Sequence, residues 1–142
     1  MSVESIESKQ EIIKTFLSDM AETASQHNLE KHMDLISKEV EVFGVPGFES
    51  ISYDDWFRQC ENEFKEKLIK AVSYENIDII DSTESVIMFK TIEHIETKDK
   101  TKNTSNVLIV ITREDDGKWR ATQERILPTN ELAQDKNFNL LN

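Results

Sequence analysis

The side chains in this chain that could do chemistry are acids and histidines placed in segments patterned as helix or strand. Asp34, His94 and Glu124 are the candidates, because a carboxyl and an imidazole that meet in one pocket can perform general acid–base catalysis. The last strand pattern sets Thr122, Glu124 and Ile126 on one face, and a one-residue slip would exchange the two faces. A buried acid without a partner would itself indicate function.

Metal and cofactor chemistry find little support in the sequence. His27, His32 and His94 lack the spacing of zinc ligands, and the single cysteine, Cys60, can complete neither a thiolate site nor an intramolecular disulfide. No glycine-rich phosphate loop and no nucleotide-binding fingerprint occurs. We therefore expect no metal and no cofactor.

Length and charge limit the remaining classes of function. The 142 residues fit one domain, here 1–142, and carry a formal net charge of −11, which repels nucleic acid and anionic membrane surfaces. The polar, acidic start resembles no targeting segment, and no apolar run approaches the roughly 18 residues of a membrane span. These features predict a cytoplasmic protein that binds neither nucleic acid nor membrane.

Hydrophobic periodicity predicts helices first and strands afterwards. A long amphipathic helix is expected over 4–27, a second helix starting after Asn28 with Ile36 on its apolar stripe, and a third capped by Ser52. A short strand lies between the second and third helices, around 40–43. Period-two segments then predict four antiparallel strands, at 71–80, 85–96, 106–113 and 118–127, and the order of the tail 128–142 is left open.

Both faces of the predicted sheet carry apolar residues. Val107, Ile109 and Ile111 point one way, and Leu108 and Val110 point the other. Helices cover only one face, so the outer face needs a second cover, and an identical sheet from a second copy is the simplest one. Trp119, Ala121, Gln123 and Arg125 would face that copy. The sequence thus predicts a homodimer through the outer sheet face.

The order of elements resembles the nuclear-transport-factor-2-like superfamily, which includes ketosteroid isomerases and SnoaL-like proteins. The local matches are "HNLEKHMDLISKEVEVFGVPG" at 27–47, "WFRQ" at 56–59 and "DDGKWRATQERIL" at 115–127. The resemblance implies a cystatin-like α+β cone, in which three N-terminal helices pack on a curved antiparallel sheet. It also implies a ligand cavity at the open end of the cone.

In isomerase-like members of that superfamily, polar groups in the cavity polarise a carbonyl and move a proton. Carried onto this sequence, those positions hold Met20, Gly44, Phe57 and Ile109, none of which can exchange a proton. The resemblance therefore implies a mainly apolar pocket, and no catalytic residue is assigned. The expected pocket residues are Met20, Phe43, Phe48, Tyr53, Trp56, Phe57, His94, Ile109 and Glu124.

The leading prediction is a non-catalytic module that binds a small apolar ligand or a partner. One alternative is an enzyme of the lyase, isomerase or cyclase type that uses Asp34, His94 or Glu124. A second alternative is a purely structural dimerisation domain, which predicts a cavity filled by its own side chains.

Overall fold

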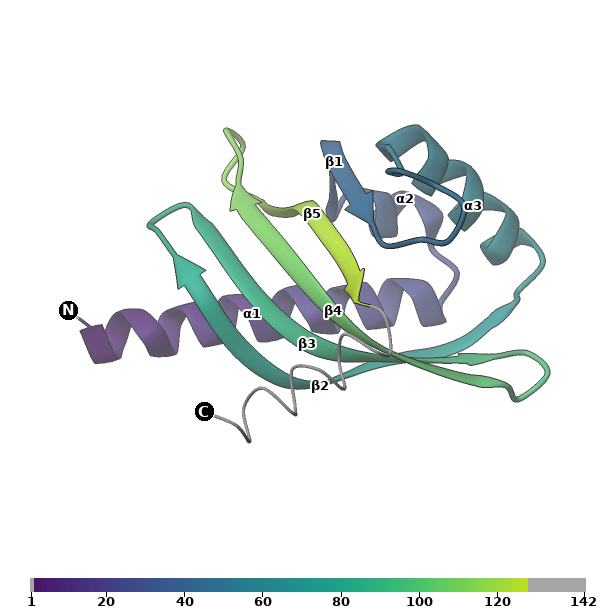
Figure 1. Cartoon of the computed structure of the whole chain (residues 1–142), viewed down its shortest axis with the longest axis horizontal. Coiled ribbons are helices and arrows are strands. Elements are labelled where there is room, and N and C mark those ends of the chain that lie inside the picture. The colour runs from purple at the N-terminus through teal and green to yellow at the C-terminus, as the bar shows by residue number, and fades with distance from the viewer. Residues whose placement is uncertain (1, 128–142) are drawn as a thin grey trace.

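A computed structural model describes residues 2–127 of the chain (Figure 1). The predictions for the tail 128–142 lie outside these residues. The elements are α1 (Ser2–Ser25), α2 (Leu29–Met33), β1 (Ile36–Phe43), α3 (Tyr53–Lys65), β2 (Ile69–Ser82), β3 (Val86–Thr97), β4 (Lys102–Arg113) and β5 (Trp119–Leu127).

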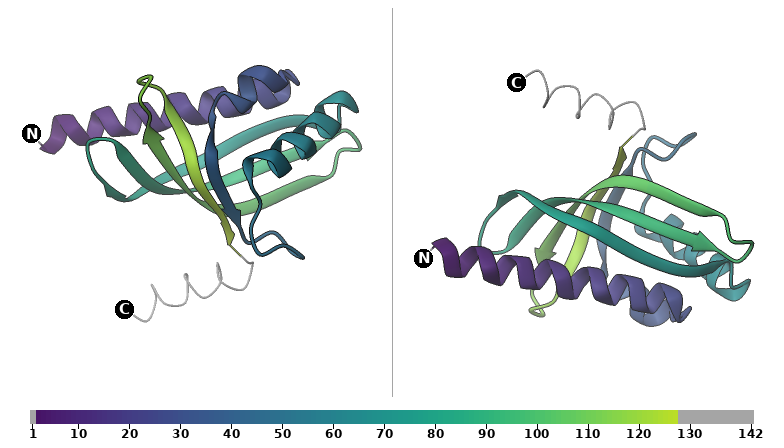
Figure 2. Two further views of the ribbon diagram at one scale, coloured as in Figure 1. Left: turned by 90° about the horizontal axis from the view of Figure 1, so that it is seen from above. Right: turned by 90° about the horizontal axis from the view of Figure 1, so that it is seen from below.

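The strands form one five-stranded sheet in the order β1-β5-β4-β3-β2. Neighbours from β2 to β5 are antiparallel, as predicted, whereas β1 pairs in parallel with β5. The sheet is curved, α1 runs across one of its faces, and α2 and α3 lie near the β1 end (Figures 1 and 2). This confirms the predicted α+β cone, with β1 as its one parallel strand.

The helix starts follow the predicted capping chemistry. The Asn28 side chain accepts a hydrogen bond from the Lys31 backbone N–H and begins α2, and Ser52 and Asp55 form a reciprocal capping box at the start of α3. The prediction for Ile36 was wrong. The short helix α2 ends at Met33, and Ile36 is the first residue of β1, buried in the core.

The core forms between α1 and the inner face of the sheet. Its most deeply buried sheet residues alternate along β3 and β4: Ile87, Phe89, Val107, Ile109 and Ile111. The register of β5 against β4 shifts between Val110 and Ile111. The shift brings Ala121 into the core at 1% exposure, so the prediction that it faces a partner copy was wrong.

The predicted strands 85–96 and 106–113 leave a polar loop between them, and the loop in the structure is shorter than that. Lys102 to Asn106 already belong to β4, and the tight turn before them places Lys100 at a positive φ. The long β3–β4 hairpin therefore extends the sheet beneath α3 (Figure 1). Within the residues described, no helix is long and apolar enough to cross a membrane.

Candidate functional site

A cavity of about 270 Å³ lies where the C-terminal half of α1 meets α2, α3 and the inner face of the sheet. Most of its wall is apolar, formed by side chains such as Met20, Val42, Ile51, Val72 and Ile126. Acids, a tyrosine and a histidine interrupt this wall. The polar lining residues are His32, Gln59, Cys60, Glu63, Tyr74, Glu93 and Glu124.

Glu124 is the most unusual of these residues. It lies on β5 next to Ile126, is only 6% exposed, and forms no hydrogen bond with any described residue. Burial, and then repulsion from Glu93, raise the pKa of its carboxyl to about 8. At neutral pH the Glu124 side chain therefore carries a proton and lines the cavity as an uncharged acid.

Tyr74 and Glu93 face the same cavity from the neighbouring strands β2 and β3. The Tyr74 hydroxyl donates a hydrogen bond of 3.0 Å to Oε2 of Glu93. Burial raises the pKa of Glu93 as well, although the hydrogen bond from Tyr74 opposes that shift. The cavity thus holds two carboxyls that influence each other's ionisation, and one of them is linked to a phenol.

His32 is held in an uncharged state by its surroundings. The Thr23 hydroxyl donates to the Asp19 backbone carbonyl at 2.7 Å and lies 2.8 Å from His32 Nδ1. When the hydroxyl proton goes to the Asp19 carbonyl, Nδ1–H of His32 donates to Thr23 and Nε2 carries the lone pair. Burial lowers the pKa of His32 to about 4, so the ring is neutral at physiological pH.

Two further residues of α3 in the wall are titratable. Burial raises the pKa of the Cys60 thiol to about 12, and the neighbouring Trp56 opposes that shift. Partial burial also raises the pKa of Glu63, and the neighbouring Gln59 opposes that shift. Glu63 is a third carboxyl at the cavity wall.

Of the residues that the sequence assigned to the pocket, the structure brings Met20, Trp56 and Glu124 together in this cavity. Ile109 lies deeper, in the core beneath it. Tyr53 and Phe57 instead border a broad groove along β1.

The other assigned residues lie outside the cavity wall. Phe48 is 62% exposed, and Phe43 packs under the Arg125 guanidinium, 4.9 Å from the ring centre. His94 has the opposite strand parity from Glu93, and its ring nitrogens contact Glu75 at 2.7 Å and Thr104 at 3.0 Å. His94 therefore does not meet Glu124.

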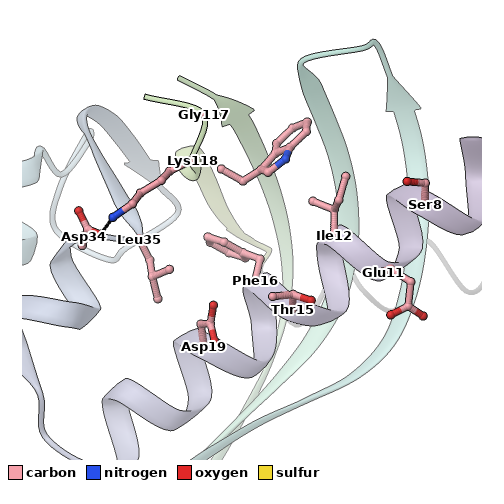
Figure 3. A pocket seen from close by; sticks show the side chains of 11 residues that line it. Ser8, Glu11, Ile12, Thr15, Phe16, Asp19, Asp34, Leu35, Gly117 and Lys118 are labelled. Carbon is pink, nitrogen blue, oxygen red and sulfur yellow. Dashed lines mark hydrogen bonds and ion pairs between the residues drawn. The ribbon is translucent and has the colours of Figure 1, made fainter. Parts of the chain in front are cut away.

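Asp34 also lies apart, at the edge of an open groove between α1 and the β4–β5 hairpin (Figure 3). Its carboxylate accepts hydrogen bonds from Lys118 at 2.7 Å and Arg120 at 3.1 Å. These cations lower the pKa of Asp34 and keep it ionised. The predicted trio Asp34, His94 and Glu124 is therefore scattered, and only Glu124 reaches the cavity.

Sequence reasoning missed Tyr74 and Glu93, although a signal was present. Glu93 shares its strand parity with Ile87, Phe89 and Thr91, which are all buried, so the pattern of β3 places its side chain inward. Tyr74 shares its parity with Val72, another residue of the cavity wall.

Gly44 explains why the proton-moving acid of the isomerases is absent. A Cβ atom built on Gly44 would lie 2.0 Å from the Ile126 carbonyl oxygen, and the residue has a φ of +89°. No side chain fits there while β1 and β5 keep this spacing. The acid–base groups of this cavity lie at other positions, among them Glu93 and Glu124.

Residues 13–126 match the model of the SnoaL-like domain. The chain belongs to the SnoaL-like family. No group of histidine, cysteine, aspartate and glutamate side chains among the described residues is arranged to hold a metal ion. A search of curated proteins finds no significant match.

Solved structures share the fold of this SnoaL-like chain at low sequence identity. A proposed scytalone dehydratase from Novosphingobium aromaticivorans is 14% identical, with a TM-score of 0.69 over 87% of this chain and 85% of that one. An NTF2-like protein with a cystatin-like fold from the same organism is 14% identical, with a TM-score of 0.68 over 86% and 82%. A proposed ketosteroid isomerase from Shewanella frigidimarina is 12% identical, with a TM-score of 0.62 over 80% and 92%.

Proposed function

We propose that this SnoaL-like protein binds a small molecule in the cavity, with its apolar body against the aliphatic wall and its polar end at Glu93 and Glu124. The observation that carries the proposal is the Glu124 side chain, only 6% exposed in the cavity wall, with no hydrogen bond to any described residue. No side-chain oxygen among the described residues is both fully buried and unpaired, so the Glu124 carboxyl opens onto the cavity, where the polar end of a ligand can reach it.

The size of the cavity supports a ligand of modest size. Its volume of about 270 Å³ lies just below the roughly 300–1,000 Å³ of typical ligand pockets. A purely structural domain would fill this space with its own side chains, so the volume counts against that alternative.

Three naphthalene probes that differ only in their polar end test the proposal: 1-naphthylmethylamine, 1-naphthalenemethanol and 1-naphthoate. We expect at least one to bind with one-to-one stoichiometry in calorimetry. Ile95→Trp, which fills the cavity from its wall, should weaken binding at least tenfold, whereas Ile80→Trp, at an exposed position of β2, should leave it unchanged. Binding of none of the probes, or equal binding by both variants, would reject a ligand cavity.

Acid–base catalysis is a second candidate function, favoured by the Tyr74–Glu93 hydrogen bond beside the protonated Glu124. Glu124 would donate a proton to the bound molecule while Glu93 accepts one, which suits an isomerase or lyase. Exchange of the α-hydrogens of 2-tetralone with solvent deuterium, followed by NMR, should slow about 100-fold in Glu93→Gln. Exchange no faster than in buffer alone would rule this candidate out for ketones.

We also propose that the protein acts as a cytoplasmic homodimer. Leu108 lies half-buried on the face of β4 opposite the core row, which supports an interface there, although Val110 on the same face is already buried within the single chain. Sedimentation at micromolar concentration should give twice the chain mass, and a monomer would contradict the dimer.

A further inference from the structure

Few hydrogen-bond donors of the cavity wall are open to a ligand. The Tyr74 hydroxyl donates to Glu93, and Nδ1 of His32 contacts the Thr23 hydroxyl. The neutral donors that remain are the Trp56 indole and the Gln59 amide, both on α3.

Acceptors, in contrast, are in excess. Both oxygens of Glu124 lack a partner among the described residues, Glu93 keeps one oxygen beyond its bond to Tyr74, and His32 presents the lone pair of Nε2. This excess suits a ligand whose polar end is rich in N–H donors.

The charges of the wall point the same way. The lining holds three carboxyl groups, on Glu63, Glu93 and Glu124, and no lysine or arginine. An anionic ligand would find no cation in this wall to neutralise its charge. A bare metal ion is also disfavoured, since the described acids and histidines form no group that could coordinate one.

The remaining wall favours an organic body for the ligand. Trp56, Phe64 and Tyr74 supply aromatic rings, which attract cations through their π faces, and aliphatic side chains form the rest. An ammonium group attached to an apolar body therefore satisfies the free acceptors, the charge and the apolar surface together.

We propose that the ligand of this cavity is an organic cation, a protonated primary or secondary amine on an apolar body, whose N–H groups donate to Glu93 and Glu124. This inference rests on the proposed function and deepens it by naming the class of ligand. No covalent bond changes. Glu124 gives its proton to solvent when the ammonium binds, and the resulting carboxylate becomes the counter-ion.

The same three naphthalene probes test this inference at pH 7. We expect 1-naphthylmethylamine to bind at least tenfold more tightly than 1-naphthalenemethanol, and 1-naphthoate to bind most weakly. Calorimetry in buffers of different ionisation enthalpy should show release of close to one proton per amine bound. The alcohol should release none.

Two variants that each replace a glutamate with glutamine distinguish binding in the cavity from binding to the acidic surface. Glu124→Gln should weaken amine binding at least tenfold, abolish proton release and weaken alcohol binding by a clearly smaller factor. Glu41→Gln makes the same change at an exposed position of β1 and should alter neither. Retained circular dichroism and thermal unfolding of Glu124→Gln would show that the loss is not misfolding.

Each other outcome is informative. If the alcohol or the naphthoate binds as tightly as the amine, the inference of a cationic ligand fails while the ligand cavity stands. If the amine binds equally to wild type and Glu124→Gln, its binding is to the acidic surface and the inference fails. If no probe binds, both the inference and the proposed function fail.

Discussion

Replacing Gly44 with alanine is expected to destabilise the fold by about 4 kcal/mol or more, in the range reached only by severe core disruptions. The added Cβ would overlap the Ile126 carbonyl oxygen at 2.0 Å, and the φ of +89° is itself unfavourable for a residue with a side chain. Relief would require β1 and β5 to separate where their parallel pairing ends. Urea unfolding of the variant beside wild type measures the loss.

Gly117→Ala provides the matched control. Gly117 has a similar φ of +84°, but a Cβ there meets no atom within 4 Å. Its replacement should therefore lower the free energy of unfolding only by the cost of a positive φ for a residue with a side chain, about 1–2 kcal/mol. If both variants lose the same free energy of unfolding, close contact with Ile126 is not the reason why position 44 excludes a side chain.

The free energy of unfolding is expected to fall as pH rises from about 6.5 to about 8. The folded protein keeps a proton on Glu124 up to a pKa of about 8, whereas the unfolded chain loses it near the ordinary value of 4.5. The folded state therefore binds more protons in this window, and raising the pH favours unfolding. Between pH 6.5 and pH 8 the free energy of unfolding should fall by about 2 kcal/mol. The raised pKa of Glu93 adds to this fall in the same direction.

Below that window His32 acts in the opposite direction. Its pKa falls from 6.5 to about 4 on folding, so the unfolded state binds more protons between these values and stability rises with pH there. The slopes of His32 and Glu124 largely cancel between pH 4.5 and 6.5. A plateau followed by a decline is the expected profile.

Glu124→Gln should flatten the decline above pH 6.5, because the amide does not titrate. Glu41→Gln, at an exposed carboxyl, should leave the profile of wild type intact. Chemical denaturation at half-unit pH steps gives the three curves. A wild-type profile that stays level to pH 8 would show that Glu124 ionises normally in the folded protein.

The fold was largely predictable because its signals are local. The cap at Ser52 and the period-two segments each follow from short-range chemistry, and each appears in the structure. The face of the sheet on which Ala121 lies was not predictable, because it depends on a register shift between β4 and β5. No local sequence pattern indicates that shift. The end of α2 before Ile36 was also set by pairing with β5.

The site was less predictable than the fold because its parts come from several elements that are distant in the sequence. Alternation places Glu93 on the same face as Phe89, but only the assembled sheet brings it to Tyr74 and Glu124. His94, one residue later, is directed to the opposite face by the same alternation. Residue type alone had favoured the histidine over the glutamate.

The most direct test of the central claim is the titration of Glu124 itself. Carbon-13 NMR of glutamate Cδ in the folded protein, assigned with Glu124→Gln, follows the carboxyl through its ionisation. A midpoint near pH 8 is expected for a proton held inside the cavity. A midpoint near 4.5 would mean that the carboxyl is solvated or paired, and neither the binding site nor its chemistry would stand.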